Sequence, residues 1–210
     1  MPRAEPSVLV RWNRGQVVVN AIGPLKRARR KVFESPSLCI RIVLRAGRAR
    51  ALLGTPMHEL ADRIVPIEDL WRDAGAQLRE SLAATDLPRA IELVESALRD
   101  RLAGSDVETS RDEFLADAMR ALDVGDDRIA TVARDLGLSD RHLRRLFQEH
   151  LGMTPKHYAR IARLGRVLSR RPSPWAAVAA EAGFHDQSHL IREFRDLLQV
   201  TPQSFRNPMS

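Results

Sequence analysis

The spacing of apolar residues changes along the chain, from β-branched runs in the first fifty residues to a helical period beyond them. Three runs, SVLVRW, QVVVNAI and SLCIRIVL, are separated by Gly, Asn and Pro, which predicts three short strands. From Pro56 on, apolar residues recur at steps of three and four, which predicts amphipathic helices near 66–84 and 88–103. Pro88 suits a first helical turn and Gly104 a helix end.

The rest of the chain predicts helices almost throughout, with Gly, Ser and Pro between them. The expected fold is therefore mainly α, with a small α+β domain of a few strands and two amphipathic helices at 1–104, a linker at 105–110 and a helical domain at 111–210. The helices expected there lie near 111–122, 126–136, 140–150, 155–170, 174–182, 186–198 and 202–206.

An internal repeat lies within this helical part. The segment IATVARDLGLSDRHLRRLFQEHLGMTPKHYAR, residues 129–160, aligns without a gap on WAAVAAEAGFHDQSHLIREFRDLLQVTPQSFR, residues 175–206. Each copy predicts a short helix, a turn at Gly137 or Gly183, and a longer helix capped by Ser139 or by His185 and Asp186. Such a pair of helices is a helix-turn-helix unit, or else an ordinary helical hairpin with a solvated face. The duplication favours the first interpretation.

The second helix of each copy shows what it could bind. Its apolar residues, Leu143, Leu146 and Phe147 or Leu190 and Phe194, are expected to face inward. Arginine and glutamine side chains then face outward on the first two turns, where they suit guanine and adenine edges in a DNA major groove. The outward set is Asp140, Arg141, Arg144, Arg145, Gln187, Ser188, His189, Ile191 and Arg192.

Charge and composition agree with a polyanionic partner. The chain carries a net charge of +7; residues 125–210 hold 14 basic and 9 acidic groups, whereas residues 51–124 hold 8 and 16. No run long and apolar enough to span a membrane occurs, and the N-terminus lacks a secretory signal, so a cytoplasmic protein is expected. The single cysteine, Cys39, is expected to be a buried structural thiol.

Residues 126–207 resemble the DNA-binding domain of the AraC/XylS family of bacterial transcription regulators. The resemblance rests on LSDRHLRRLFQEHLGMTPKHY and AGFHDQSHLIREFRDLLQVTPQSFR. It implies two helix-turn-helix units, at 128–151 and 174–198, joined by a linker helix at 155–170 that lets both recognition helices enter successive major grooves of duplex DNA. It also implies base contacts from Arg141, Arg144, Arg145, Gln187, Ser188, His189 and Arg192, and phosphate contacts from Lys156 and Arg195.

The family pattern is not followed everywhere. Pro174 and Trp175 stand where the family usually has less rigid residues at the start of the helix. Ile191 stands where a polar side chain is frequent. The base sequence of the second DNA half-site is therefore not assigned. Residues 45–71 resemble the end of a cupin-like sensory domain whose strand region is short here. A normal small-molecule pocket could therefore be absent, and the existence of an effector stays open.

The resemblance implies a sequence-specific regulator, by analogy an activator, for which RNA polymerase is a candidate partner. The helices at 66–103 are a candidate homodimer surface, although an amphipathic stripe can equally be core. The alternatives are a non-specific nucleic-acid binder or helical adaptor, and a truncated regulator without effector response.

Enzymatic function is not expected, and neither is a cofactor or a metal. His185 and His189 are four residues apart with Asp186 between them, but no third ligand is evident. No glycine-rich phosphate loop occurs, and GLSDRH is not a nucleophile elbow because no strand precedes it.

Overall fold

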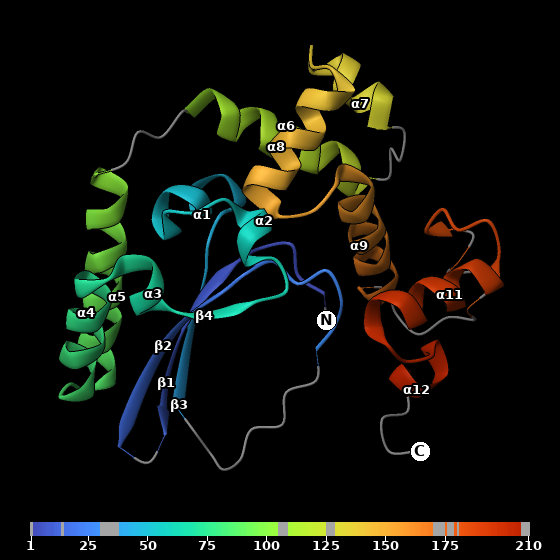
Figure 1. Cartoon of the computed structure of the whole chain (residues 1–210). Coiled ribbons are helices and arrows are strands. Elements are labelled where there is room, and N and C mark those ends of the chain that lie inside the picture. The colour runs from blue at the N-terminus through green and yellow to red at the C-terminus, as the bar shows by residue number, and fades with distance from the viewer. Residues whose placement is uncertain are drawn as a thin grey trace.

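The computed structural model of the chain describes residues 2–13, 15–29, 38–104, 109–124, 129–169, 175, 179 and 181–206. Most of the predicted linker, the beginning of the helix expected at 126–136, the last residue of the predicted linker helix and most of the helix expected at 174–182 lie outside the described residues. The remainder forms a small sheet, a layer of helices against it and a larger helical part (Figure 1).

The N-terminal strands form one antiparallel sheet in the order β3-β1-β2-β4. Its strands are β1 (Ser7–Asn13), β2 (Gln16–Ile22), β3 (Leu38–Val43) and β4 (Ile64–Pro66). The three predicted strands are confirmed, and β4 is an additional one that pairs Val65 with Ala21. The alternating residues Val8 and Val10 on β1, with Val17 and Val19 on β2, are buried, as the apolar runs predict.

Five helices follow β3 in this part of the chain, two before β4 and three after it. They are α1 (Ala46–Leu53), α2 (Met57–Leu60), α3 (Ile67–Trp71), α4 (Asp73–Ala83) and α5 (Leu87–Ala103). Helical structure thus begins at Ala46, ten residues before Pro56. The single helix expected near 66–84 is wrong, because Arg72 has φ 52° and separates α3 from α4. A Cβ on Gly75 would lie 2.9 Å from the Cα of Glu68, so only glycine lets the chain fold back this closely.

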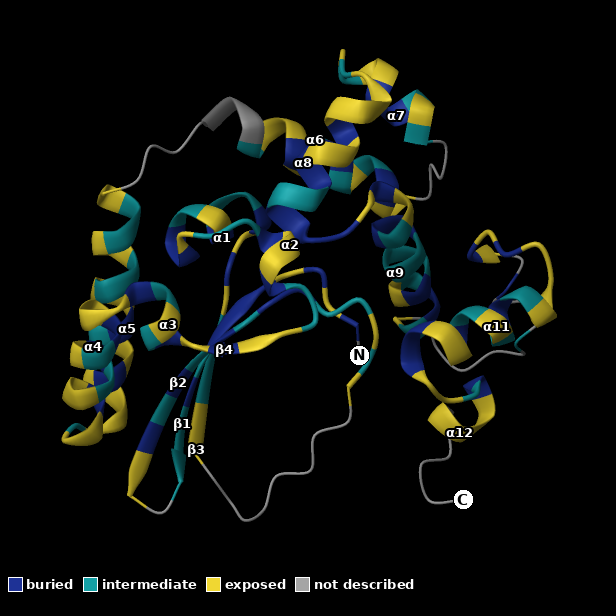
Figure 2. Cartoon of the chain, viewed as in Figure 1, coloured by how far each residue is buried: buried dark blue, intermediate teal, exposed yellow. Residues whose placement is uncertain are grey.

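The helix expected at 88–103 is confirmed as α5, where the Asp86 carboxylate accepts a hydrogen bond from the backbone N–H of Arg89. Its residues Ala90 and Val94 are buried in the same core as the sheet. Leu87 and Ile91 on α5 are exposed. Figure 2 shows the alternation of buried and exposed positions along α4 and α5.

Six helices of the C-terminal part are described. They are α6 (Thr109–Val124), α7 (Ile129–Asp135), α8 (Asp140–Leu151), α9 (Pro155–Leu168), α11 (Gln187–Leu198) and α12 (Pro202–Arg206). Leu115 and Leu122 of α6 pack with Phe147 of α8 in one core, while Leu164 of α9 and Phe194 of α11 share another. Within the described ranges, no helix is both long and apolar enough to cross a membrane.

The N-terminal part packs directly on the C-terminal helices. Ala46 at the start of α1 is buried in the core that contains α6 and α8. Arg50 of α1 forms an ion pair of 3.0 Å with Glu149 of α8. A Cβ on Gly152, the residue that ends α8, would lie 2.4 Å from the carbonyl oxygen of Met57 on α2. The end of α8 is therefore in close contact with α1 and α2 (Figure 1).

The expectation for Cys39 is wrong, because this cysteine is exposed. It lies near the start of β3, an edge strand that pairs only with β1 in the described sheet. A side chain on this outer strand lacks the cover that the central strands have, although its sequence neighbours are apolar.

Candidate nucleic-acid interface

The first helix-turn-helix unit consists of α7, a tight turn and α8. The backbone N–H of Leu138 donates to the carbonyl oxygen of Ala133 at 2.8 Å, and Gly137 has φ 67°. This is the left-handed conformation that closes a helix and favours glycine. The Ser139 hydroxyl then accepts a hydrogen bond of 3.2 Å from the backbone N–H of His142 and begins α8. The glycine turn and the Ser139 cap are both confirmed.

The second unit repeats this geometry. The backbone N–H of Phe184 donates to the carbonyl oxygen of Ala179 at 2.9 Å, and Gly183 has φ 78°. The cap of α11 is the Asp186 carboxylate, which accepts a hydrogen bond of 2.7 Å from the backbone N–H of His189. That hydrogen bond, supported by one with the ring of His185, holds the pKa of Asp186 below its usual value.

The two copies are not aligned without a gap, contrary to the interpretation of the sequence. The turn glycines are 46 positions apart, whereas the helix caps Ser139 and Asp186 are 47 apart. Gly152 and Gln199, which end α8 and α11 in the left-handed conformation, are also 47 apart. The second turn therefore contains one additional residue, and positions of the two recognition helices correspond at a spacing of 47.

This corrected correspondence explains the inner faces of the helices. Leu143 and Phe147 of α8 are buried, as are their counterparts Leu190 and Phe194 of α11. Leu146, also buried in α8, has Glu193 as its counterpart in α11. The second recognition helix therefore turns a carboxylate toward the position at which the first has a leucine.

The outer faces carry the predicted base-contact residues. The side chains of Arg144 and Arg145 are mostly exposed, with only long ion pairs of 4.0 Å to Asp140 and 3.8 Å to Glu149 on the same helix. Such exposed pairs are weak and leave the guanidinium groups available for another partner. The other exposed candidates are Arg141, Lys156, Gln187, Ser188, Arg192 and Arg195.

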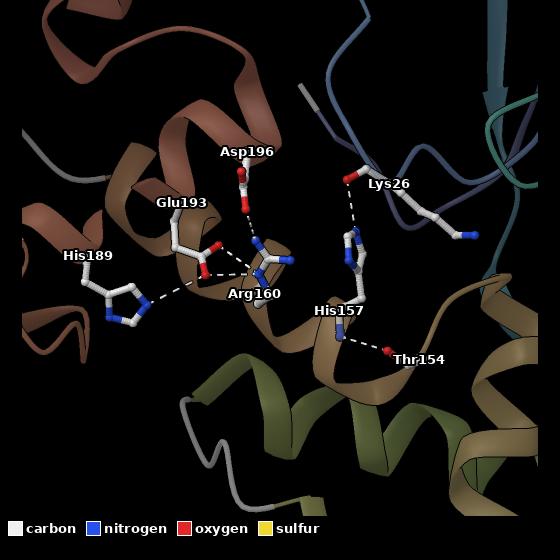
Figure 3. Close-up of polar contacts among 7 residues, drawn as sticks. All are labelled: Lys26, Thr154, His157, Arg160, His189, Glu193 and Asp196. Atoms are coloured by element: carbon white, nitrogen blue, oxygen red, sulfur yellow. Dashed lines mark hydrogen bonds and ion pairs between the residues drawn. The ribbon is translucent and has the colours of Figure 1, made fainter. Parts of the chain in front are cut away.

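His189 differs from the other candidates. Its side chain is 33% exposed, and its Nε2 lies 3.7 Å from a carboxylate oxygen of Glu193. Its ring also packs edge-on against Phe184, with the ring centroids 5.3 Å apart. Figure 3 shows the ring directed toward Glu193 and α9. The structure thus gives His189 partners within the protein that the sequence interpretation did not include.

The structure adds one residue that the sequence analysis missed. Arg160 of α9 donates through Nε to both carboxylate oxygens of Glu193, at 3.0 and 2.9 Å, and through Nη2 to Asp196 at 3.0 Å (Figure 3). The signal available in the sequence is Glu193 itself, an acid at an apolar position of the helical repeat. A buried acid requires a partner, but the spacing alone does not identify which arginine supplies it.

Among the described residues, no group of three or more His, Cys, Asp and Glu side chains is arranged to hold a metal ion. His185 and Asp186 are in contact at 3.1 Å, but both lie at the exposed turn before α11. The arrangement that the described residues do form is a pair of capped helices with exposed arginines, both of which pack against α9.

Comparison with known proteins gives the class of this chain. Residues 115–208 match the family model described as "Helix-turn-helix domain". The chain is 25% identical over 169 residues to an uncharacterised HTH-type transcriptional regulator of Haemophilus influenzae, a match covering 76% of this chain and 55% of that protein. It is 36% identical over 83 residues to the HTH-type transcriptional regulator GlxA of Rhizobium meliloti, covering 38% of this chain and 25% of that protein.

Among solved structures, a variant of apo ToxT from Vibrio cholerae is similar with a TM-score of 0.47 and 13% identity, covering 98% of this chain and 86% of that one. The chain spans about half the length of the Haemophilus relative and a quarter of the length of the Rhizobium relative.

The chain therefore contains a helix-turn-helix domain, and the relatives that it matches are transcriptional regulators. The match over residues 115–208 agrees with the resemblance to the AraC-type helix-turn-helix domain seen in the sequence. Transcription regulators such as these relatives are normally not enzymes.

Proposed function

We propose that this protein binds duplex DNA in a sequence-specific manner by inserting α8 and α11 into successive major grooves. The observation that supports this most strongly is the equivalence of the two units, which share a glycine turn, a side-chain cap and a left-handed C-terminal residue. Both helices expose arginine on their N-terminal halves, where bidentate contacts to guanine are available.

The assignment of individual side chains belongs to this proposal. Base contacts are assigned to Arg141, Arg144, Arg145, Gln187, Ser188, His189 and Arg192, and phosphate contacts to Lys156 and Arg195. Because the two helices expose different side chains, the preferred operator is asymmetric: two arginines at the centre of α8 correspond to Ile191 and Arg192 in α11.

The wider organisation is proposed with it. The protein acts as a regulator of transcription in the cytoplasm. Its chain is divided into an N-terminal domain at residues 1–104, a linker at 105–110 and a DNA-binding domain at 111–210. By family analogy its output is activation, with RNA polymerase as the partner that activation requires. The exposed Leu87 and Ile91 on α5 favour a homodimer through this helix, and sedimentation of the full chain tests for it.

The experiment that tests sequence-specific binding is selection from a randomised duplex library by the full chain at physiological salt. We expect enrichment of one asymmetric site with two blocks about one helical turn apart. Salt-sensitive retention of every duplex without enrichment would contradict this function and favour a charge-driven binder. A reporter gene placed behind the selected site then distinguishes activation from repression.

A further inference from the structure

The contact between α9 and α11 combines an apolar core, which contains Leu164 of α9 and Phe194 of α11, with polar contacts from one guanidinium group. Arg160 joins two carboxylates on α11, Glu193 and Asp196, which are three residues apart and therefore lie on one face of that helix. The side chains of Arg160 and Glu193 are 28% and 12% exposed. Ion pairs with this little exposure are screened far less than surface pairs.

The position of Glu193 makes this contact directional. Its counterpart in α8, Leu146, packs in an apolar core, where the contacts have no hydrogen-bond direction. The single Nε–H of Arg160 is shared between the two carboxylate oxygens of Glu193, so this contact depends on the direction of the planar guanidinium. The same guanidinium donates one further hydrogen bond to the more exposed Asp196, and the two contacts together favour one rotation of α11 about its own axis and one distance from α9.

The part of α9 that carries Arg160 is packed into the first helix-turn-helix unit. Tyr158 and Ala159, which precede Arg160 on α9, are buried in the core that contains α8. The ring of Tyr158 packs edge-on against Phe147 of α8, with centroids 5.6 Å apart. Arg163, one turn further along α9, lies over the ring of Phe184 in the second turn at 5.3 Å. Arg160 thus connects the body of the first unit to the recognition helix of the second.

We propose that Arg160 is a positioning residue, which through Glu193 and Asp196 sets the separation and relative rotation of α8 and α11 and so restricts the protein to operators of one half-site spacing. This inference rests on the proposed function. One added base pair moves the second half-site by about 3.4 Å and rotates it by about 34°. If α11 is held in one orientation, it cannot contact the displaced half-site. If α11 can move relative to α8, it can still contact that half-site.

The first test uses the selected operator with its two blocks at the native spacing, or one base pair closer or further apart. For the wild-type chain we expect binding to weaken by about tenfold or more at either altered spacing, a typical size for coupling between two sites. Arg160→Ala and Glu193→Gln are both expected to reduce this discrimination severalfold. Arg120→Ala, which removes the same type of side chain from the exposed surface of α6, is the matched control and retains it.

Arg160→Ala removes a positive charge and Glu193→Gln removes a negative one, so comparing the two variants distinguishes a positioning role of Arg160 from other roles. If Arg160 were only a phosphate contact, Arg160→Ala would weaken binding at all three spacings equally and Glu193→Gln would not change the spacing preference. If the contact only stabilised the fold, both variants would unfold at lower temperature with an unchanged spacing preference. Either result overturns the proposal.

A measurement without DNA distinguishes failure of this inference from failure of the proposed function. Spin labels are attached at Arg134→Cys on α7 and Gln203→Cys on α12, both exposed, in a Cys39→Ser background. We expect the distance distribution to broaden or shift on Arg160→Ala and on Glu193→Gln. A distribution unchanged in both variants overturns the positioning role, whether or not an operator is found. A broadened distribution with no enriched operator retains the mechanical role of Arg160 and rejects the DNA function.

Discussion

Arg144 and Arg192 have exposed guanidinium groups on the N-terminal halves of the two recognition helices. Arg144→Ala or Arg192→Ala is expected to weaken binding to the selected operator by about 1–3 kcal/mol, the size of one bidentate base contact. The measurement is the Kd for the operator and for a scrambled duplex at the same salt concentration. Unchanged operator affinity in both variants would contradict their assignment.

Lys156 at the start of α9 provides the contrast, because a phosphate contact carries no sequence information. Lys156→Ala is expected to weaken binding to operator and scrambled duplex alike, and to make the dependence of log K on log salt concentration shallower by about one unit. A salt dependence equal to that of the wild-type chain would remove Lys156 from the phosphate contacts.

His150, buried on the inner face of α8, makes stability depend on pH. Burial lowers its pKa below 6.5, and the neighbouring Asp112 only partly opposes this. Because the folded state binds this proton less readily than the unfolded chain, the stabilisation is complete above about pH 6.5 and is lost as pH falls toward the lower folded-state pKa.

We therefore expect the free energy of unfolding to decrease between pH 7 and pH 5, and to decrease less in His150→Gln. Chemical denaturation at several pH values measures this. His142→Gln, at an exposed position of the same helix, is the control and retains the wild-type dependence. His157, whose pKa burial also lowers, contributes in the same direction. Identical pH dependence in wild type and His150→Gln would contradict this account.

At the scale of the element, the start of α8 depends on a side-chain cap. Ser139→Ala removes the acceptor for the backbone N–H of His142 and is expected to destabilise the chain by about 1 kcal/mol. For a chain of this size that lowers Tm by about 2–4 °C. Ser139→Thr keeps a hydroxyl acceptor and is the control. A calorimetric Tm equal for all three proteins would show that water replaces the cap.

Elements with a local signal could be predicted from the sequence. The strands β1 to β3 and the helices α5 to α9, α11 and α12 carry their own periodicity, caps or glycine stops. By contrast, β4 is three residues long, ends in Pro66 and is a strand only because it pairs with β2. The break at Arg72 depends on the approach of Gly75 to Glu68, which apolar spacing does not encode.

The candidate site could likewise be predicted only where its features are local in the sequence. Gly137, Gly183 and the caps are local features, so the turns and the beginnings of both recognition helices follow from the sequence. The additional residue in the second turn was missed because the two copies have equal length when aligned end to end. The contact of Arg160 with Glu193 joins residues 33 positions apart, and the inward direction of His189 follows from that contact.

At the scale of the molecule, Gly152 connects the two parts of the chain. It has φ 63°, and its backbone lies against the carbonyl of Met57. Gly152→Ala combines a left-handed alanine, about 1–3 kcal/mol, with a clash that pushes α2 away from α8. Gly137→Ala is the matched control, since its φ is 67° and nothing lies within 4 Å of the added Cβ.

We expect Gly152→Ala to lower the free energy of unfolding by more than Gly137→Ala does. Chemical denaturation of the full chain measures both, and the difference isolates the contact with α2. Equal losses in the two variants would mean that α2 moves aside without cost and that this contact does not hold the two parts together.

The N-terminal part also reaches the second unit. The backbone N–H of Ala28 donates to the carbonyl of Leu197 at the end of α11, at 2.6 Å, and the carbonyl of Lys26 lies 3.0 Å from the Nε2 of His157 on α9 (Figure 3). This loop is also held by Asp62, in the turn between α2 and β4, whose carboxylate accepts a hydrogen bond of 2.9 Å from the N–H of Lys26.

These attachments restrict how the molecule can be recombined. A chimaeric regulator joined at residue 104, with a foreign sensor in front of this DNA-binding part, would leave Gly152 and the end of α11 without the surfaces against which they pack. A working junction would have to keep Ala4 and residues 24–29 and 44–62 with the helices that they contact. The exchangeable portion is then the outer sheet with α3 to α5, a much smaller module than the domain boundary suggests.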